Sequence, residues 1–202
     1  GALELRLMKK MGYNASTIGN HEFDAGLSKL RENIIDSNFE FICSNYDFTN
    51  TELDGITKNY NIYERSGIKI GVFGLGIELK GLVNPNLYKE TKYIDPIEVS
   101  DDMVRFLKKE EKCDLIICVS HLGHYYDSSK ISDIKLAKIT SGIDLIIGGH
   151  THTFLEKPEI IRNKDGKNVI INQVGTRGVY MGKIDFSFTN LDKKATDSIL
   201  EV

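Results

Sequence analysis

The chain has 202 residues, of which 41% are apolar and 27% are charged, and its formal net charge is −3. This composition is typical of a globular domain and excludes disordered, collagen-like and disulfide-stapled proteins. The small net charge gives no general case for binding nucleic acid or an anionic membrane, and no apolar run approaches the roughly 20 residues that span a bilayer.

Helical and strand patterns alternate along the first part of the chain. Apolar residues recur at helical spacing up to Met11, and Gly12 is a natural stop for that helix. The next predicted elements are, in chain order, a short strand over 14–18, a helix over 25–37, a strand over 39–44, and a hairpin of 60–63 and 68–73 joined at Ser66-Gly67. In helix 25–37 one apolar face is expected, which consists of Leu27, Leu30, Ile34 and Ile35.

Loop-like sequence follows over 77–94, and Pro96 suits the first turn of a helix that runs to about residue 111. Two similar segments come next, Asp114–His121 and Asp144–His150, and each is an Asp, a mostly apolar run and then a His. A helical stretch over 131–140 separates them. Together they predict a right-handed βαβ unit with buried parallel strands.

The last quarter of the chain has strand-like runs over 169–173 and 180–188, which we expect to be antiparallel, and residues 191–202 favour no particular element. The patterns contain no repeat, and no linker divides them. They predict one domain of the α/β class with a mixed sheet.

Two features bear on the compartment without deciding it. The three cysteines, Cys43, Cys113 and Cys118, show no CxxC spacing, and Cys118 lies in an apolar run where it suits the role of a small apolar side chain. The chain begins Gly1-Ala2 without a start methionine, a basic region or an apolar signal core. Either a targeting segment has been removed, or the chain is a piece of something longer.

Histidines gather where strands are expected to end. His21, His121 and His150 each lie at a predicted junction between a strand and a loop, and the carboxyl ends of strands are where open α/β sheets bind ligands. The adjacent strands of the βαβ unit bring His121 and His150 to the same sheet edge. His121 is then a metal ligand or, alternatively, a histidine that caps a strand end.

The segment Gly148–Thr153 carries two histidines. His150 and His152 point the same way if the backbone is extended, and two adjacent imidazoles suit Zn, Mn, Co or Fe. The preceding glycines allow close backbone approach and unusual dihedral angles. The alternative is a polar loop with two solvated histidines. His124, three residues after His121, either lines the pocket or faces water.

Residues 19–24, GNHEFD, form a third polar cluster. Asn20 offers a neutral oxygen that can complete a metal coordination shell, while His21 points elsewhere and is free for proton or charge work. Asp24 can orient the His21 imidazole. The alternative role of Asp24 is to cap the helix that follows.

Three motifs of the chain occur together and in this order in a known family. GNHEFD at 19–24, SHLGH at 120–124 and GGHTHT at 148–153 resemble the calcineurin-like metallophosphoesterase superfamily. The first two resemble its 5′-nucleotidase branch, which includes bacterial UDP-sugar hydrolases and cyclic-nucleotide phosphodiesterases. Residues 174–182 are similar to the closing strand pair of the family, so the resemblance covers essentially the whole chain.

The resemblance implies a four-layer α/β/β/α sandwich of mixed sheets with a two-metal site at the sheet edge. It implies that Asn20, His121 and His150 hold one divalent metal ion and that His152 belongs to the other. His21, with Asp24 behind it, would stabilise developing charge or protonate the leaving oxygen, while a two-metal-activated hydroxide attacks phosphorus.

The chain departs from the family pattern before Gly19. The family carries an Asp-x-His motif and a Gly-Asp motif there, whose carboxylate bridges both metals, but the preceding eighteen residues contain no Asp and no His. We therefore expect an N-terminally truncated catalytic domain that lacks its first strand. Two cations repel strongly without a shared anion, so this chain alone is expected to bind one metal ion or none and to be weakly active or inactive.

The leading hypothesis is an enzyme that hydrolyses phosphate esters of nucleotides, as a 5′-nucleotidase, a UDP-sugar hydrolase or a 2′,3′-cyclic phosphodiesterase does. Residues 1–202 would then be part of the catalytic domain, without the family's C-terminal nucleotide-specificity domain. The alternatives are a non-catalytic module of the same fold that binds a single metal ion, and a remnant that needs a partner segment.

The expected partner is a nucleotide or another small phosphate ester, rather than nucleic acid or the membrane interior. The family branch is often periplasmic or on the cell surface, but no signal segment is present in this sequence to indicate the compartment. The oligomeric state stays open.

Overall fold

The computed structural model describes residues 2–188 and 193–201 of the chain. Its helices are α1 Ala2–Met11, the 3₁₀ turn η1 Asn20–Phe23, α2 Gly26–Ser37, α3 Pro85–Tyr88, α4 Pro96–Lys109 and α5 Asp133–Ile139. Its strands are β1 Ala15–Ser16, β2 Glu40–Phe41, β3 Tyr46–Asp47, β4 Tyr60–Arg65, β5 Ile68–Leu75, β6 Lys92–Tyr93, β7 Leu115–Ser120, β8 Leu145–Ile147, β9 Glu159–Arg162, β10 Asn168–Asn172, β11 Tyr180–Phe188 and β12 Lys193–Glu201. Within the two described ranges, no helix is both long enough and apolar enough to span a membrane.

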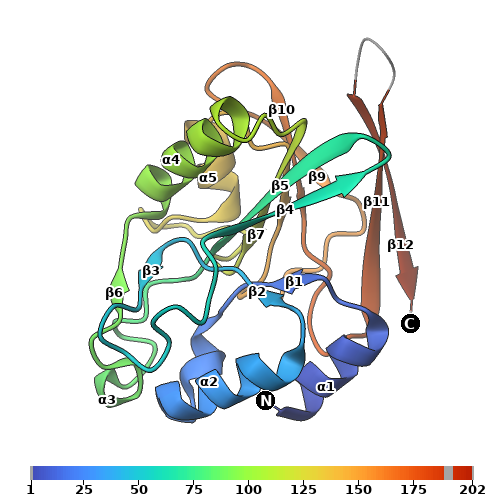
Figure 1. Cartoon of the computed structure of the whole chain (residues 1–202). Helices are drawn as coiled ribbons and strands as arrows, with labels where there is room; N and C mark the ends of the chain where they lie inside the picture. The colour runs from blue at the N-terminus through green and yellow to red at the C-terminus, as the bar shows by residue number, and fades with distance from the viewer. Residues whose placement is uncertain (1, 189–192, 202) are drawn as a thin grey trace.

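A six-stranded mixed sheet forms the centre of the fold, with the strand order β4-β5-β7-β8-β10-β9 (Figure 1). The four inner strands are parallel, whereas β4 and β9 pair antiparallel at the two edges. The expected α/β class with a mixed sheet is confirmed, as is the parallel pairing of the two Asp-to-His segments. Because β5, β7 and β8 are parallel, the loops that follow them emerge at one edge of the sheet.

Helices α4 and α5 cover one face of the six-stranded sheet (Figure 1). Val104 and Leu107 of α4 pack there with Phe73 and Ile116 of the sheet, and Cys118 is completely buried in the same cluster, as its apolar surroundings predict. All three cysteines are buried and free of disulfides. This packing fixes the direction of β7 and therefore the position of the loop that follows it.

Helix α2 packs against β2 and the segment that follows β1, on the other side of the molecule (Figure 1). Leu27, Leu30 and Ile34 are buried there with Phe41 of β2. Ile35 is 54% exposed, so its expected place on this face is wrong. The reason is that one residue along a helix turns the side chain by about 100°, which carries Ile35 past the buried stripe.

Backbone contacts join β1 and β2 to the central sheet. The chain just after β2 hydrogen-bonds to β5, where the Ser44 amide donates to the Gly74 carbonyl at 2.8 Å. An added Cβ at Gly74 would collide with the Ile42 carbonyl oxygen, so only glycine permits this close approach. The arrangement places the end of β1, and the loop after it, beside the carboxyl ends of β5 and β7.

Three short regions differ from the sequence-based prediction. The predicted strands over 14–18 and 39–44 reduce to the two-residue strands β1 and β2, which pair with each other in parallel. Residues 77–94, expected to be a loop, contain the single-turn helix α3 and the short strand β6. Such brief elements depend on local pairing partners rather than on a periodic apolar pattern.

The two strands expected to be antiparallel in the last quarter of the chain each have an antiparallel partner, but they do not pair with each other. β10 is antiparallel to β9 but parallel to β8, and β11 pairs with β12 rather than with β10. β9 has only four residues and no fully buried side chain, which explains why no strand is predicted there. β12 lies in the range for which the sequence favours no element.

An apolar groove lies between β11 and the face of β7 and β8 that points away from α4. Its lining includes Ile117, Leu145, Ile147, Tyr180 and Phe186. Ile117 neighbours Ile116 along β7, so alternation along the strand places it on the opposite face of the sheet from the α4 core.

Candidate functional site

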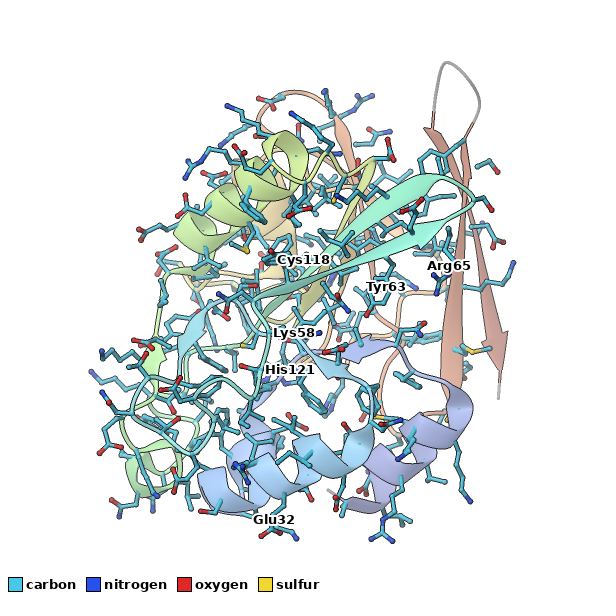
Figure 2. All side chains as sticks on the ribbon, viewed as in Figure 1. Glu32, Lys58, Tyr63, Arg65, Cys118 and His121 are labelled. Carbon is cyan, nitrogen blue, oxygen red and sulfur yellow. The ribbon has the colours of Figure 1, made fainter. Side chains whose placement is uncertain are left out.

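Three loops meet at the edge of the six-stranded sheet where β7 and β8 end, and one of them comes from the separate short strand β1. They are residues 19–24 after β1, residues 121–124 after β7, and residues 148–153 after β8. In Figure 2, His121 lies between the six-stranded sheet and helix α2. The fold therefore gathers the three polar clusters that the sequence motifs indicate.

The imidazole of His121 lies between two glycines. An added Cβ at Gly19 would lie 2.5 Å from its Nε2 atom, and one at Gly149 would lie 3.0 Å from its Nδ1 atom. Each of these glycines thus provides the space that the ring fills. Burial is the main cause that lowers the pKa of His121 to about 4, and the charges of His150, His21 and His152 contribute in the same direction. At neutral pH the ring is uncharged, which is the form that binds metal ions.

His150 contacts both other members of the expected ligand set. Its Nδ1 atom lies 3.0 Å from Oδ1 of the buried Asn20, and its ring centroid lies 5.2 Å from that of His121. Burial is again the main cause that lowers the pKa of His150, followed by the positive charge of Lys130. Two neutral imidazoles and one amide oxygen, from residues up to 130 positions apart, therefore meet at one place.

These three groups fit part of a metal coordination shell. Asn20 Oδ1 accepts a hydrogen bond from His150 Nδ1 at 3.0 Å. Adjacent ligands that each lie roughly 2.1 Å from an octahedral ion would have the same separation of about 3 Å. Within residues 2–188 and 193–201, no three His, Cys, Asp or Glu side chains are arranged to hold a metal ion. The set thus offers neutral ligands for one ion and no carboxylate to share between two.

His150 and His152 do not lie in extended backbone, so the expectation that they point the same way on that ground is wrong. Their φ angles are 71° and 54°, both in the left-handed region. The sequence predicts unusual dihedral angles at the glycines before them, but the strained residues are the histidines themselves. Each such residue costs on the order of 1–3 kcal/mol, so the conformation persists only where its surroundings hold it.

His152 is exposed, and its charge contributes to lowering the pKa of both His121 and His150. It therefore belongs to the same electrostatic neighbourhood. Its assignment to a second metal ion stays a prediction.

His21 and Asp24 form a hydrogen-bonded pair, with Nδ1 and Oδ2 2.9 Å apart and both side chains exposed. The alternative role of Asp24 as the cap of the next helix is wrong, because the N-cap of α2 is Ala25 and no side chain at the cap accepts a hydrogen bond from the first-turn amides. The Glu22 carboxylate accepts a hydrogen bond from the Gly19 amide at 2.7 Å and closes this loop on itself. A Glu three residues after a helix cap is a known signal, which the sequence analysis did not use.

His124 is 7% exposed, so it does not face water. Its Nε2 atom lies 3.5 Å from a Glu159 carboxylate oxygen, and its Nδ1 atom has no hydrogen-bond partner among the described residues. The backbone amide of His124 donates to Thr151 Oγ1 at 3.0 Å and so links the second loop to the third. A role of its side chain in lining the pocket stays a prediction.

Two buried polar residues support the loops and were missed by the sequence analysis. Asp133, at the start of α5, accepts a hydrogen bond from Ser120 Oγ at 2.5 Å, and its other oxygen lies so close to Gly148 that an added Cβ there would collide with it. Gln173, which follows β10, hydrogen-bonds to the loop that carries His150 and His152. In the sequence, Asp133 is indistinguishable from an ordinary acidic residue in the first turn of a helix. A single Gln after an apolar run is likewise too weak a signal to predict that Gln173 supports the loop.

Comparisons with known proteins agree with this arrangement. The sequence profile described as calcineurin-like phosphoesterase matches residues 2–154, which contain all three loops. The trifunctional nucleotide phosphoesterase protein YfkN of Bacillus subtilis (strain 168) is 30% identical, over 98% of this chain and 15% of its own length. A 5′-nucleotidase of Vibrio vulnificus (strain CMCP6) is 33% identical, over 91% of this chain and 36% of its own length.

A solved structure extends the likeness to three dimensions. The 5′-nucleotidase precursor from Thermus thermophilus matches with a TM-score of 0.86 and 26% identity, covering 98% of this chain and 41% of that protein. This chain therefore spans between 15% and 41% of the length of these three relatives.

Proposed function

Because this chain belongs to the calcineurin-like phosphoesterase family, we propose that it is part of the catalytic domain of a hydrolase that acts on phosphate esters of nucleotides. The observation that carries the proposal is the meeting of Asn20, His121 and His150 at one edge of the sheet, with both imidazoles held neutral. A structural core histidine needs no such partners, whereas a metal ion needs uncharged nitrogen ligands.

Asn20, His121 and His150 would hold the metal ion, and His152, on the same loop as His150, would reach a second one. When bound by these residues, a divalent ion would supply Lewis-acid chemistry, lowering the pKa of water and neutralising charge on phosphoryl oxygens. Imidazole and amide ligands suit Zn, Mn, Co or Fe, so the ligand set does not select one of them.

His21 is the proposed catalytic residue outside the metal ligands. The Asp24 carboxylate can only accept a hydrogen bond, so the His21 Nδ1 atom carries the proton of the 2.9 Å contact. The other ring nitrogen is then directed away from Asp24 and is free to face a substrate oxygen. In the imidazolium form it would donate a proton to the leaving oxygen or stabilise its negative charge.

The substrate class follows from the relatives, which are named as a 5′-nucleotidase and a nucleotide phosphoesterase. We extend to this chain a nucleotide or another small phosphate ester as substrate. The choice of base or sugar would depend on a further domain, and residues 1–202 contribute only part of the catalytic domain.

This chain by itself is proposed to hold one metal ion and to turn over weakly. Two divalent ions a few ångströms apart repel strongly unless an anion lies between them. The ligand set of Asn20, His121 and His150 is neutral and contains no carboxylate, and no three His, Cys, Asp or Glu side chains of the described residues are grouped to hold a metal ion. This same observation favours the second candidate function, a non-catalytic module that binds one metal ion, and the experiment has to separate the two.

The test measures Co²⁺ stoichiometry by elemental analysis after dialysis, for the wild-type chain, His150→Ala and the control variant His21→Ala. We expect one equivalent for wild type and for His21→Ala, and none for His150→Ala. Phosphate release from a nucleoside 5′-monophosphate is then followed in the same samples. Slow, Co²⁺-dependent release that His21→Ala abolishes would support the hydrolase.

Other outcomes decide against parts of the proposal. One equivalent of Co²⁺ with no phosphate release from any sample would favour the non-catalytic module. Two equivalents would show that another carboxylate bridges two ions. A wild-type chain that retains no Co²⁺ would remove the metal role of these residues.

A further inference from the structure

Gln173 lies directly beside the strained histidine loop. Its side chain is 2% exposed, and both ends of its amide group are used. Nε2 donates to the carbonyl oxygen of Gly149 at 2.9 Å, and Oε1 accepts from the backbone amide of Thr153 at 2.5 Å. These two hydrogen bonds enclose His150 and His152, because one lies just before the first histidine and the other just after the second.

Further contacts close the same loop. Thr151, between the two histidines, has its Oγ1 atom 3.2 Å from Gln173 Oε1 and 3.0 Å from Thr153 Oγ1. Backbone hydrogen bonds run from the Leu155 amide to the Gln173 carbonyl and from the Gly175 amide to the Thr153 carbonyl. The Gln173 side chain is thus the central contact of a pairing between residues 149–155 and residues 173–175.

The loop needs such a contact because of its backbone conformation. His150 and His152 have φ angles of 71° and 54°, which residues with a Cβ atom rarely adopt. Without an external restraint each histidine would relax toward the ordinary β or helical regions and carry its imidazole away. A fully buried amide that holds both flanks of the loop prevents this relaxation.

We propose that Gln173 is a positioning residue that holds the 149–153 loop in its left-handed conformation and thereby keeps the imidazoles of His150, a proposed ligand of the metal ion, and of His152 in place. The inference rests on the proposed function for its metal-binding part. Its conformational part stands on the hydrogen bonds of the loop and is tested without metal. Supporting residues of this kind are expected to change metal affinity by about 10–100-fold.

The test uses the isosteric variant Gln173→Met, which removes both hydrogen bonds, and the milder Gln173→Asn, which keeps an amide but is one methylene too short to reach both partners. The matched control is Asn163→Leu. Asn163 is also a buried amide, 7% exposed, and its Oδ1 atom accepts from the amides of Asp165 and Lys167 at the opposite end of β10. It restrains a turn that contains no histidine.

The first readout is the imidazole NMR spectrum of the metal-free chain. The five histidines are assigned by single substitutions. In Gln173→Met we expect the ring signals of His150 and His152 to shift or broaden, while those of His21 keep their positions. In Asn163→Leu we expect the ring signals of all five histidines to keep their positions. The second readout is Co²⁺ affinity from titration, which we expect to fall at least tenfold in Gln173→Met and less than about twofold in Asn163→Leu.

The outcomes separate this inference from the proposed function. Unchanged ring signals in both Gln173 variants would overturn the positioning role, whatever the metal result. Changed ring signals in a chain whose wild type binds no Co²⁺ would keep the positioning of the loop and remove the metal site. If Gln173→Met does not fold, Gln173→Asn decides: ring signals and affinity equal to those of Asn163→Leu would reduce Gln173 to a structural role.

Discussion

The buried carboxyl group of Asp133 supports two of the three loops from behind. It accepts a hydrogen bond from Ser120, the residue before His121, and lies against Gly148, two residues before His150. Burial raises the pKa of Asp133 to about 7 from its ordinary value of 3.8. The folded protein therefore disfavours the charged carboxylate, and this cost depends on pH.

The variant Asp133→Asn is expected to gain stability relative to wild type as the pH rises. Below about pH 4 the carboxyl is protonated in the folded and the unfolded chain, so it carries no charge cost. Between about pH 4 and pH 7 the unfolded chain loses the proton first, and the folded wild type is progressively destabilised. The difference in unfolding free energy should grow by roughly 4 kcal/mol over this interval, measured by urea denaturation in EDTA.

His121 changes stability with the opposite sign over a similar interval. Its pKa is lowered to about 4 in the folded state, so the stability it contributes is lost as the pH falls from about 6.5 to 4. This contribution is common to wild type and Asp133→Asn and cancels in their difference. Asn163→Leu, which removes no ionisable group, serves as the control and should differ from wild type by a constant amount. If the difference in unfolding free energy between Asp133→Asn and wild type were also independent of pH, this would contradict the raised pKa of Asp133.

At the scale of elements, α4 shows how a local signal sets a structural boundary. Asp95 caps the helix, because its Oδ1 atom accepts from the amides of Ile97 and Glu98 at 2.7 and 3.3 Å. Pro96 occupies the first turn, where its missing N–H group is not needed. The cap fixes the start of the helix that packs Val104 and Leu107 onto the sheet.

Asp95→Ala is expected to lower the free energy of unfolding by about 1 kcal/mol, because two helix amides lose their acceptor. Asp102→Ala, in the middle of the same helix, removes only an exposed ion pair with Arg105 and should cost less than about 0.5 kcal/mol. Urea denaturation of both variants measures the two values. Equal losses for the two variants would mean that the cap does not stabilise the helix.

At the scale of the whole molecule, a metal ion would tie together segments that are distant in the chain. Asn20 follows β1 and packs with the α2 region, whereas His121 and His150 follow the central strands β7 and β8. An ion bound only in the folded state shifts the folding equilibrium by mass action. The two apolar clusters of the fold should then unfold less readily when the ion is bound.

Co²⁺ at about 100 times its dissociation constant should add roughly 2.7 kcal/mol to the free energy of unfolding. For a chain of this size that is an increase in Tm of about 5–10 °C, and EDTA should reverse it. His150→Ala is the control and should show no increase. A similar increase in that variant would place the bound ion somewhere other than at the three loops. The measurement is differential scanning calorimetry with and without the ion.

Local patterns in the chain are enough to predict the fold class, the βαβ unit and the loops that carry the candidate site residues. These patterns are continuous apolar runs for β7 and β8, a Pro after Asp95 for α4, and histidines that follow strands. The hairpin of β4 and β5 also follows from local chemistry, because Ser66 and Gly67 adopt the positive φ angles of 51° and 78° that tight hairpin turns require. Each of these signals is contained within a few neighbouring residues.

How the site is held together depends instead on contacts that form when the chain folds. Folding places Asn20 3.0 Å from His150, turns both loop histidines into left-handed backbone, and puts Asp133 and Gln173 behind them. It also pairs β10 in parallel with β8, which brings Gln173 to the loop. These contacts join residues about 20 to 130 positions apart, and they arise when separate apolar faces are buried together. A local pattern in the chain therefore does not predict them.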